Sequence, residues 1–414
     1  MSITRRGFIL NGLGFVSLGM TMPSVLFKAS QALADAPAPR GKTLVVLEMA
    51  GGNDGLNTVV PTGAEYALYQ AARPTIGLTR QQIIDIGGGL GLHPALAPLA
   101  DLFKAGKMAV VTGVGYPNPI RSHFVSMDIW QMGDPQKGSA RNGWIGRYLD
   151  ADGHFNGKPL GGIALGSELP LALQGENITS CVVSADGSAG LGSKSPDTSA
   201  QMASFREMYQ SAGTTANSST EFIHNVGNDI YTSTDAIKDA FKHYDTAAGL
   251  KANYPARNGL ADNLQAISRM ICGGLPTKVY YTITGGFDTH ANQPRGQEAA
   301  LSVMADSVAA FYRDLELQGH ANDVTLMTFS EFGRRVHENA SQGTDHGTAS
   351  VMFVVGSAVR GGAFGSYPSL TNLDNGDLKF TTDFRSVYAT LLDNWLGTPS
   401  QKVLGGNYAP LKFV

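Results

Sequence analysis

The sequence has little cysteine, and this shortage excludes one class of protein. Only Cys181 and Cys272 occur in 414 residues. Two cysteines are too few for the disulfide framework of a small secreted domain. Two buried thiols are the favoured interpretation of the pair, and a disulfide between them is the alternative.

Charged residues are also scarce. They make up 16% of the chain, the net charge is −3, and no basic run occurs anywhere. A mildly acidic chain of this kind has no surface suited to the phosphate backbone, so no nucleic-acid partner is expected. Internal repeats are lacking as well, which excludes solenoid and propeller architectures.

The N-terminal residues predict an export signal. Arg5 and Arg6 precede a weakly apolar run, and an Ala-Leu-Ala cleavage site ends at Ala34. Residues 1–34 are therefore expected to be a twin-arginine signal peptide, with the Tat translocase as partner during export and a periplasmic or secreted mature chain. A membrane anchor is the alternative. It is disfavoured because the run is short and holds Asn11, so no stable membrane span is expected after cleavage.

Apolar runs alternate with helical patterns through the rest of the chain. The runs are continuous rather than alternating, which is typical of strands buried on both faces. This alternation predicts an α/β fold with a mostly parallel sheet and helices on both faces. The predicted strands are 43–49, 108–114, 161–166, 278–284, 323–329 and 349–356, and the predicted helices are 94–106, 122–133, 261–274, 297–319 and 383–397.

Residues 35–414 are expected to form one domain. A stretch around 185–260 breaks the alternation, because it is rich in Ser, Thr, Asn, Gly and Asp and has weaker helical patterns. We interpret it as a polar helical insertion that covers one end of the sheet, and a lid is the alternative.

Acidic and histidine residues gather where the predicted strands end. In an open α/β sheet, ligands bind outside the carboxyl ends of the strands. Carboxylates and imidazoles at such an edge are the donors that a hydrolytic metal site requires. Taken singly, each residue could equally be a cap or a turn residue. The residues at this edge are Asp54 in "LEMAGGNDG", Asp288 and His290 in "GGFDTHANQ", Glu331 in "TFSEFGRR", and Asp345 and His346 in "GTDHG".

A hydroxyl group stands at the start of a predicted helix. Ser122, in "PIRSHFVSM", follows a loop rich in Pro and Gly. The free N–H groups and the positive end of the dipole at a helix N-terminus favour a bound anion. Ser122 is therefore a candidate nucleophile or metal-bridging residue, and a simple N-cap is the alternative. Arg121 could hold an anion, and His123 could contact the substrate or shield the site.

Several segments together resemble a bacterial exported family known as domain of unknown function 1501. They are "LEMAGGNDGLNTVVP", "RSHFVSMDIWQMG", "GGFDTHANQ", "TFSEFGRRVHENASQGTDHGTASVMFVVG" and "DFRSVYATLLDNWLG". This family in turn resembles the alkaline phosphatase–sulfatase superfamily. The resemblance implies an alkaline-phosphatase-like core in which Asp54 is the metal ligand after the first strand and Ser122 is the nucleophile. It also implies that Asp288 and His290 hold one metal.

The resemblance leaves two alignments for the last ligands. In one, Asp345 and His346 match the Asp-His pair of sulfatases. In the other, which the strand context favours, Glu331 takes the acid position and His346 is the last histidine. The Asp–His spacing in "DTH" is shorter than usual, and "SEF" lacks the usual Asp-His pair. One or two ions of zinc, manganese, magnesium or calcium are the cofactors implied.

The function predicted from these observations is metal-dependent hydrolysis of a small phosphate or sulfate ester by an exported enzyme. A non-catalytic periplasmic binding or assembly protein, with the same fold and a degraded metal site, is the first alternative. A hydrolase that uses the serine and histidine without a metal is the second.

Overall fold

The computed structural model describes residues 41–135, 142–154, 160–178, 180–187 and 233–414. The predicted signal peptide lies outside the described residues, as does most of the predicted insertion. At the end of the insertion, residues 233–243 are helical and α9 (Thr246–Leu250) follows them. The domain boundaries therefore stay predictions.

One large sheet organises the described part of the chain. Within it the strand order is β11-β5-β10-β9-β1-β8-β6-β7, and β14 also pairs with β5. β1 lies between β8 and β9 and is parallel to both, with Met49 opposite Thr284 and Glu48 opposite Phe329. The strands are β1 (Thr43–Met49), β5 (Met108–Gly115), β6 (Gly162–Leu165), β7 (Cys181–Val183), β8 (Val279–Thr284), β9 (Val324–Phe329), β10 (Ser350–Gly356), β11 (Gly362–Phe364) and β14 (Thr382–Asp383).

One strand runs against its neighbours. β10 is antiparallel to both β5 and β9, whereas the other pairings in this sheet are parallel. The reason is the connection: residues 330–349 form no helix that could carry the chain back across the sheet. The chain therefore turns at the carboxyl edge, and β10 starts at the edge where β9 ends. The predicted class, an α/β fold with a mostly parallel sheet, is confirmed.

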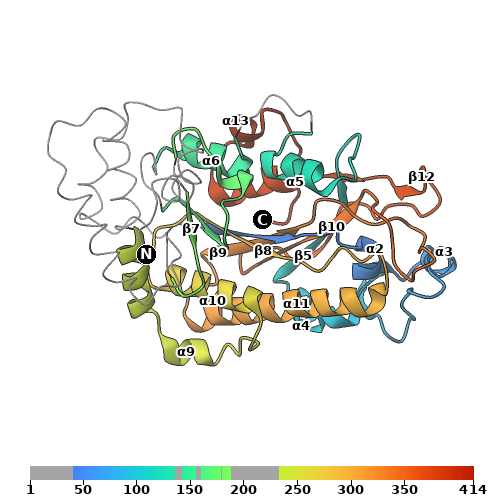
Figure 1. Ribbon diagram of the computed structural model, residues 1–414, viewed down its shortest axis with the longest axis horizontal. Coiled ribbons are helices and arrows are strands. Elements are labelled where there is room, and N and C mark those ends of the chain that lie inside the picture. The colour runs from blue at the N-terminus through green and yellow to red at the C-terminus, as the bar shows by residue number, and fades with distance from the viewer. Residues whose placement is uncertain (1–40, 136–141, 155–159, 179, 188–232) are drawn as a thin grey trace, which may run out of the picture.

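Helices cover both faces of the sheet (Figure 1). The central strands β1, β5 and β10 are buried along their length because apolar side chains of both faces pack against helices. One face packs against α4 (Ala97–Lys104), α10 (Gly259–Cys272) and α11 (Gln293–Leu317). The opposite face packs against α5 (His123–Met132), α6 (Trp144–Asp152), α12 (Phe384–Thr390) with its π-helical extension η4 (Leu391–Leu396), and α13 (Ser400–Leu404).

A smaller lobe follows β1. The helical turn α2 (Gly55–Thr58) leads into a sheet of β2 (Val59–Pro61), β4 (Leu90–Leu92) and β3 (Ile84–Gly87). Helix α3 (Tyr66–Ala72) packs on it in a third apolar cluster. The remaining short elements are the 3-10 turns η2 (Pro94–Leu96) and η3 (Leu171–Leu173), and the hairpin of β12 (Leu373–Asp374) and β13 (Asp377–Leu378).

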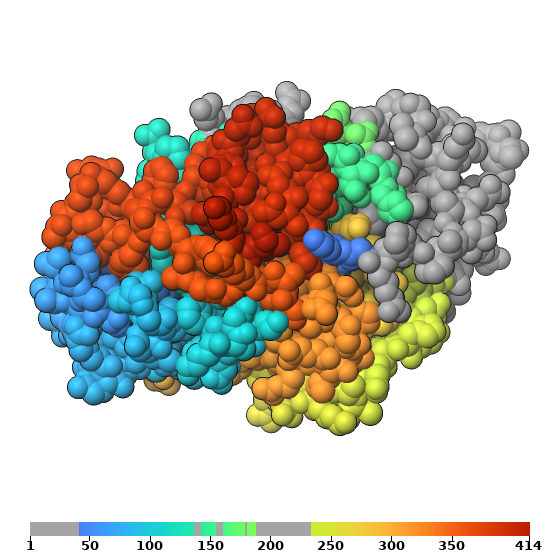
Figure 2. Space-filling model, turned by 180° about the vertical axis from the view of Figure 1, so that it is seen from behind, coloured from blue at the N-terminus to red at the C-terminus, as the bar shows by residue number. Residues whose placement is uncertain are grey.

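The two ends of the described chain pack together. Figure 2 shows the first residues (blue) emerging beside the C-terminal segment (red). Trp395 donates its indole N–H to the carbonyl of Thr43 at 3.0 Å. No disulfide links Cys181 to Cys272, and both are half-buried. Within the described ranges, no helix combines the length and the apolar character needed to cross a membrane.

Candidate metal centre

The predicted strand-end residues meet at the carboxyl edge of the main sheet. Asp288 and His290 follow β8, Glu331 follows β9, and His346 precedes the antiparallel β10. His123 joins them from the first residue of α5, which follows β5. Four segments therefore share one edge, because β5, β8 and β9 end there and the antiparallel β10 begins there.

Asp288 is the centre of the cluster. Its Oδ1 accepts a hydrogen bond from Arg334 Nη2 at 2.6 Å, while about half of its side chain is exposed. Burial pushes the pKa of Asp288 up, but hydrogen bonds from Arg334 and His346 outweigh burial and hold that pKa below its usual value. Asp288 is therefore an anion that is anchored on one side and open on the other.

Arg334 is the residue that holds this turn in place. It is buried, and it donates to the carbonyls of Gly52 at 2.7 Å, Thr344 at 2.8 Å and Phe287 at 3.1 Å. One guanidinium thus joins the turn after β1, the turn after β8 and the loop after β9. It fixes the backbone from which the clustered side chains project.

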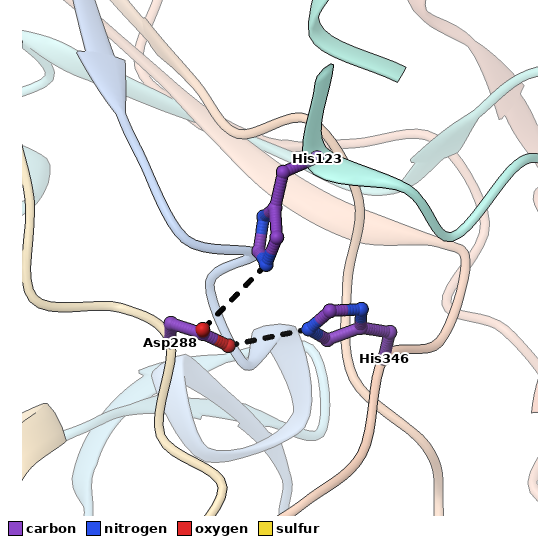
Figure 3. Close-up of side chains that lie close together, drawn as sticks. All are labelled: His123, Asp288 and His346. Atoms are coloured by element: carbon purple, nitrogen blue, oxygen red, sulfur yellow. Dashed lines mark hydrogen bonds and ion pairs between the residues drawn. The ribbon is translucent and has the colours of Figure 1, made fainter. Parts of the chain in front are cut away.

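His346 points its Nε2 at Asp288 from one side (Figure 3). Nε2 lies 3.2 Å from Asp288 Oδ1, and Nδ1 lies 2.9 Å from the carbonyl oxygen of Arg121. A carbonyl oxygen can only accept, so Nδ1 carries a proton. Nε2 is then the nitrogen that faces Asp288, and it is the one that would bind an ion once it carries no proton.

His123 approaches Asp288 from another side (Figure 3). Its Nε2 lies 3.6 Å from Asp288 Oδ2, and its Nδ1 lies 2.7 Å from Glu331 Oε1. The Glu331 side chain is buried, and it also accepts from the N–H of Gly51 at 2.8 Å and from the Ser330 hydroxyl at 3.0 Å. Glu331 therefore stands behind His123, where it orients the ring.

His290 completes the group. Its Nε2 lies 2.9 Å from His346 Nε2 and 3.1 Å from Asp288 Oδ1, while its Nδ1 lies 3.5 Å from Asp345 Oδ1. Asn339 holds Asp345 with a hydrogen bond of 3.2 Å. This bond, together with His290, lowers the pKa of Asp345, although partial burial opposes the shift. Asp345 thus lies behind His290.

A glycine turn makes room for the cluster. Gly51 and Gly52 follow β1 with φ of +122° and +76°, backbone angles that residues with a side chain rarely adopt. A Cβ on Gly51 would lie 2.5 Å from the backbone nitrogen of Asp288, and one on Gly52 would lie 2.3 Å from the Phe332 ring. The two glycines therefore let the strand end pack directly against the Asp288 turn.

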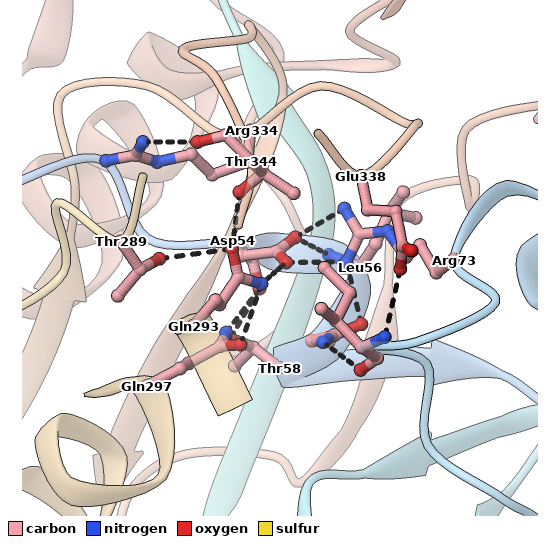
Figure 4. Close-up of polar contacts among 12 residues, drawn as sticks. Asp54, Leu56, Thr58, Arg73, Thr289, Gln293, Gln297, Arg334, Glu338 and Thr344 are labelled. Atoms are coloured by element: carbon pink, nitrogen blue, oxygen red, sulfur yellow. Dashed lines mark hydrogen bonds and ion pairs between the residues drawn. The ribbon is translucent and has the colours of Figure 1, made fainter. Parts of the chain in front are cut away.

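Asp54 does not join the cluster as predicted (Figure 4). It is buried as the N-cap of α2, and its Oδ1 accepts from the N–H of Leu56 at 3.2 Å. Arg73 donates to its two oxygens at 2.5 and 2.9 Å, and Gln293 donates to Oδ2 as well. Asp54 is therefore a helix cap, as in the alternative interpretation. Its ligand role stays a prediction, which the ion pair with buried Arg73 does not favour.

Ser122 and Arg121 lie beside the cluster. Ser122 is exposed and occupies the N-cap position of α5, but its hydroxyl makes no capping hydrogen bond. The Arg121 guanidinium pairs with buried Asp377, so the prediction that it holds an anion is not supported. The contribution of Arg121 to the cluster is instead its carbonyl oxygen, which orients His346.

Three functional contacts were missed in the sequence. Arg73 and Arg334 are 19 and 46 positions from the acids they bind, and no local pattern links them. The ligand-like placement of His123 did have a signal, since it begins a helix at the same sheet edge as Asp288. Metal binding by any of these residues remains a prediction.

The chain belongs to a family described as "Protein of unknown function (DUF1501)". The family model matches residues 105–403, which is most of the chain. This confirms the family predicted from the sequence motifs. None of the curated proteins matches the sequence.

Solved structures with a similar fold include a member of the alkaline phosphatase superfamily, alkaline phosphatases and a sulfatase. One is a superfamily member from Vibrio parahaemolyticus, with 9% identity over 90% of this chain and 71% of that chain, at a TM-score of 0.39. Another is the C-terminal periplasmic domain of EcEptC from Escherichia coli in complex with Zn, with 10% identity, 78% and 75% coverage and a TM-score of 0.36.

A third is the lipoteichoic acid synthase LtaP from Listeria monocytogenes. It has 8% identity over 88% of this chain and 76% of that chain, at a TM-score of 0.35. Similarities at these scores are distant and carry no argument about the site. The chemistry of the cluster has to be argued from its own residues.

Proposed function

We propose that this protein is an exported, metal-dependent hydrolase of phosphate or sulfate esters. The observation that carries the proposal is the arrangement around Asp288. His346 and His123 both aim Nε2 at its carboxylate, while their Nδ1 atoms face fixed acceptors. Imidazoles held this way are characteristic of ligands, because the acceptor behind the ring sets the tautomer.

The residues present fit a divalent cation. His123, Asp288 and His346 each offer a ligand atom within 4.8 Å of the others. The acids Asp288, Glu331 and Asp345 outnumber the one arginine that contacts Asp288, so the cluster attracts positive charge. Zinc, manganese, magnesium and calcium are the candidates, as one ion or two. A bound ion would neutralise the ester oxygens and activate a hydroxyl group.

Ser122 is the hydroxyl group best placed to attack the ester. It is exposed, it precedes His123 directly, and it stands where the first N–H groups of α5 are free to bind an anion. Because its hydroxyl makes no capping bond, it is available for chemistry. Its oxygen would form the new bond to phosphorus or sulfur, and the alcohol part of the ester would leave with the proton that Ser122 gives up. Water would then cleave the covalent ester, which releases phosphate or sulfate and restores the hydroxyl group.

The test is turnover of model esters by the purified mature chain. p-Nitrophenyl phosphate and p-nitrophenyl sulfate are offered to protein stripped by a chelator and then reloaded with each candidate ion. We expect at least one ester to be hydrolysed only with metal, and Ser122→Ala to abolish turnover. Ser302→Ala on α11 is the matched control and should retain full activity. Metal-loaded protein that turns over neither ester would favour the binding-protein alternative.

Export is a separate part of the proposal. The twin arginine at Arg5 and Arg6 is its basis, and these residues lie outside the described ranges. Replacing both with lysine should hold the chain in the cytoplasm, whereas the unchanged chain should appear in the periplasm or medium. Cell fractionation with antibody detection measures the difference. Equal export of both forms would overturn this part and leave the hydrolase proposal standing.

A further inference from the structure

We infer that the cluster is a single-ion site rich in nitrogen donors, which selects zinc or a similar transition metal over magnesium and calcium, and that His123 is one of its ligands. The inference deepens the proposed function, since it rests on metal binding at the same site. It does not depend on ester hydrolysis, and its test reads metal directly.

Three donor atoms already form a compact triangle. The edges are 2.9 Å between His290 Nε2 and His346 Nε2, 3.1 Å between His290 Nε2 and Asp288 Oδ1, and 3.2 Å between His346 Nε2 and the same oxygen. Ligands at tetrahedral zinc, with bonds of about 2.0–2.1 Å, are separated by roughly 3.3 Å. The triangle therefore has nearly the size of one face of such a site.

His123 supplies the next donor. Its Nε2 lies 3.6 Å from the other Asp288 oxygen, Oδ2, and within 4.8 Å of the His346 donor. The ring lies edge-on to His346, with ring centres 4.4 Å apart, and tilted against Phe332, with ring centres 4.9 Å apart. To join the same coordination shell, its Nε2 and the other donors would have to approach to roughly 3.3 Å.

Each imidazole has its own acceptor behind it. Nδ1 faces Glu331 in His123, the Arg121 carbonyl in His346 and Asp345 in His290. Three rings turned the same way, with Nε2 inward, are not required by packing, because these side chains are partly exposed. The pattern matches the outer partners that orient metal-bound histidines.

Two of the other acids near the cluster are already occupied by partners. Glu331 is saturated by His123, Gly51 and Ser330, and Asp54 is saturated by Arg73 and Gln293. Among the described residues, no other group of three His, Cys, Asp or Glu side chains comes as close together. A two-metal site needs bridging or paired acids for both ions, so one ion is expected.

The donor type decides the metal. Magnesium and calcium take six or more oxygen ligands, whereas three imidazoles and one carboxylate suit zinc and its neighbours. Asp288 and His290 are about half exposed, so one side of the site faces solvent. That side leaves room for a water molecule or an ester oxygen as a fifth ligand, since zinc can expand to five-coordinate.

Isothermal titration of the chelator-stripped mature chain tests the inference. The probes are zinc, manganese, magnesium and calcium alone, and elemental analysis counts the ions per chain. We expect one zinc ion, bound at least 1000-fold more tightly than magnesium or calcium. Cobalt bound at the site should give the intense visible absorption of a four- or five-coordinate, nitrogen-bound ion. Two ions per chain, or equal affinity for magnesium, would overturn the inference.

The ligand role of His123 is tested with His123→Gln. It should weaken zinc by more than the 10–100-fold expected for an orienting residue. It should also change the cobalt spectrum. His337→Gln, at an exposed histidine of the loop after β9, is the control and should do neither. Circular dichroism of the metal-free variants establishes that both fold. A His123 variant with unchanged zinc affinity and spectrum would remove this residue from the site.

The two proposals fail separately. Tight binding of one zinc ion with no ester turnover would overturn the proposed hydrolase function and leave the proposed metal site standing. Turnover supported by magnesium, with His123→Gln as active as the wild type, sinks the metal site described here and leaves a hydrolase.

Discussion

Arg73 donates to both carboxylate oxygens of Asp54, and neither side chain is exposed to solvent. Arg73 also donates to Asn57 and to the carbonyls of Val336 and Arg335. The pair therefore ties the turn after β1 to the loop that carries Asp345 and His346 (Figure 4). A buried ion pair that is fully hydrogen-bonded is costly to break, since removing one partner strands the other charge.

Asp54→Asn should destabilise the protein without changing the number of ions bound. We expect the free energy of unfolding to fall by about 3–5 kcal/mol, because Arg73 loses its counter-charge. Urea denaturation measures the loss, and elemental analysis counts the metal. Asp306→Asn, at an exposed position on α11, should change stability by less than about 0.5 kcal/mol. Loss of a metal ion from a folded Asp54 variant would restore Asp54 as a ligand.

Ser122→Ala should leave stability unchanged. The hydroxyl makes no capping bond, so the usual loss of about 1 kcal/mol for an N-cap serine is not expected. We predict a change within about 0.5 kcal/mol by thermal or urea unfolding. A loss near 1 kcal/mol would show that the hydroxyl caps α5 in solution, which would make it less available as a nucleophile.

Glu331→Gln and Asp345→Asn should both weaken metal binding without abolishing it. Each carboxylate lies behind a histidine, and outer partners of this kind contribute about 10–100-fold in affinity. The Glu331 change should cost more, because that side chain is buried and lies 2.7 Å from His123, whereas Asp345 is exposed and lies 3.5 Å from His290.

Titration of both variants with zinc gives the comparison. Glu316→Gln, at an exposed position on α11, is the control and should bind zinc as the wild type does. Complete loss of binding in a folded Glu331 or Asp345 variant would mean that the carboxylate is itself a ligand. Loss in the Glu331 variant would support the alignment that uses Glu331 as the acid ligand. Loss in the Asp345 variant would support the alignment that pairs Asp345 with His346.

Glu48 should make stability depend on pH. It is buried on β1, and burial raises its pKa from 4.5 to about 7, with a further rise from nearby Glu331. Hydrogen bonds from Tyr281 and Gln131 partly oppose the shift. The folded state thus holds this proton more tightly than the unfolded state. The stability that Glu48 contributes to the folded state is fully present below about pH 4.5 and is lost as the pH rises through about 7.

The matching experiment compares wild type and Glu48→Gln by urea denaturation at pH 5 and pH 8. Glutamine does not titrate in this range. The wild type should lose on the order of 2–3 kcal/mol more than the variant between the two pH values, at about 1.4 kcal/mol per pKa unit. Equal pH dependence in both proteins would show that Glu48 has the same pKa in the folded and unfolded states.

Much of the fold was accessible from the sequence because its signals are local. The predicted strand 43–49 is β1 itself, and the predicted helix 122–133 coincides with α5 to within one residue at each end. Continuous apolar runs and glycine stops determine such elements within a few neighbouring residues. The antiparallel direction of β10 also has a local cause, because no helix forms between residues 330 and 349.

The site divides differently. By itself, the sequence determined which residues reach the carboxyl edge, since strand ends and loop lengths place Asp288, His290 and His346 there. Only the tertiary structure decided what each side chain does at that edge. Arg73 neutralises Asp54, and Glu331 turns towards His123, through contacts that span 19 and 208 positions. Such roles depend on hydrogen-bond distances between segments that are far apart in the sequence, and differences of a few tenths of an ångström matter. A pattern of residue types carries no information at that scale.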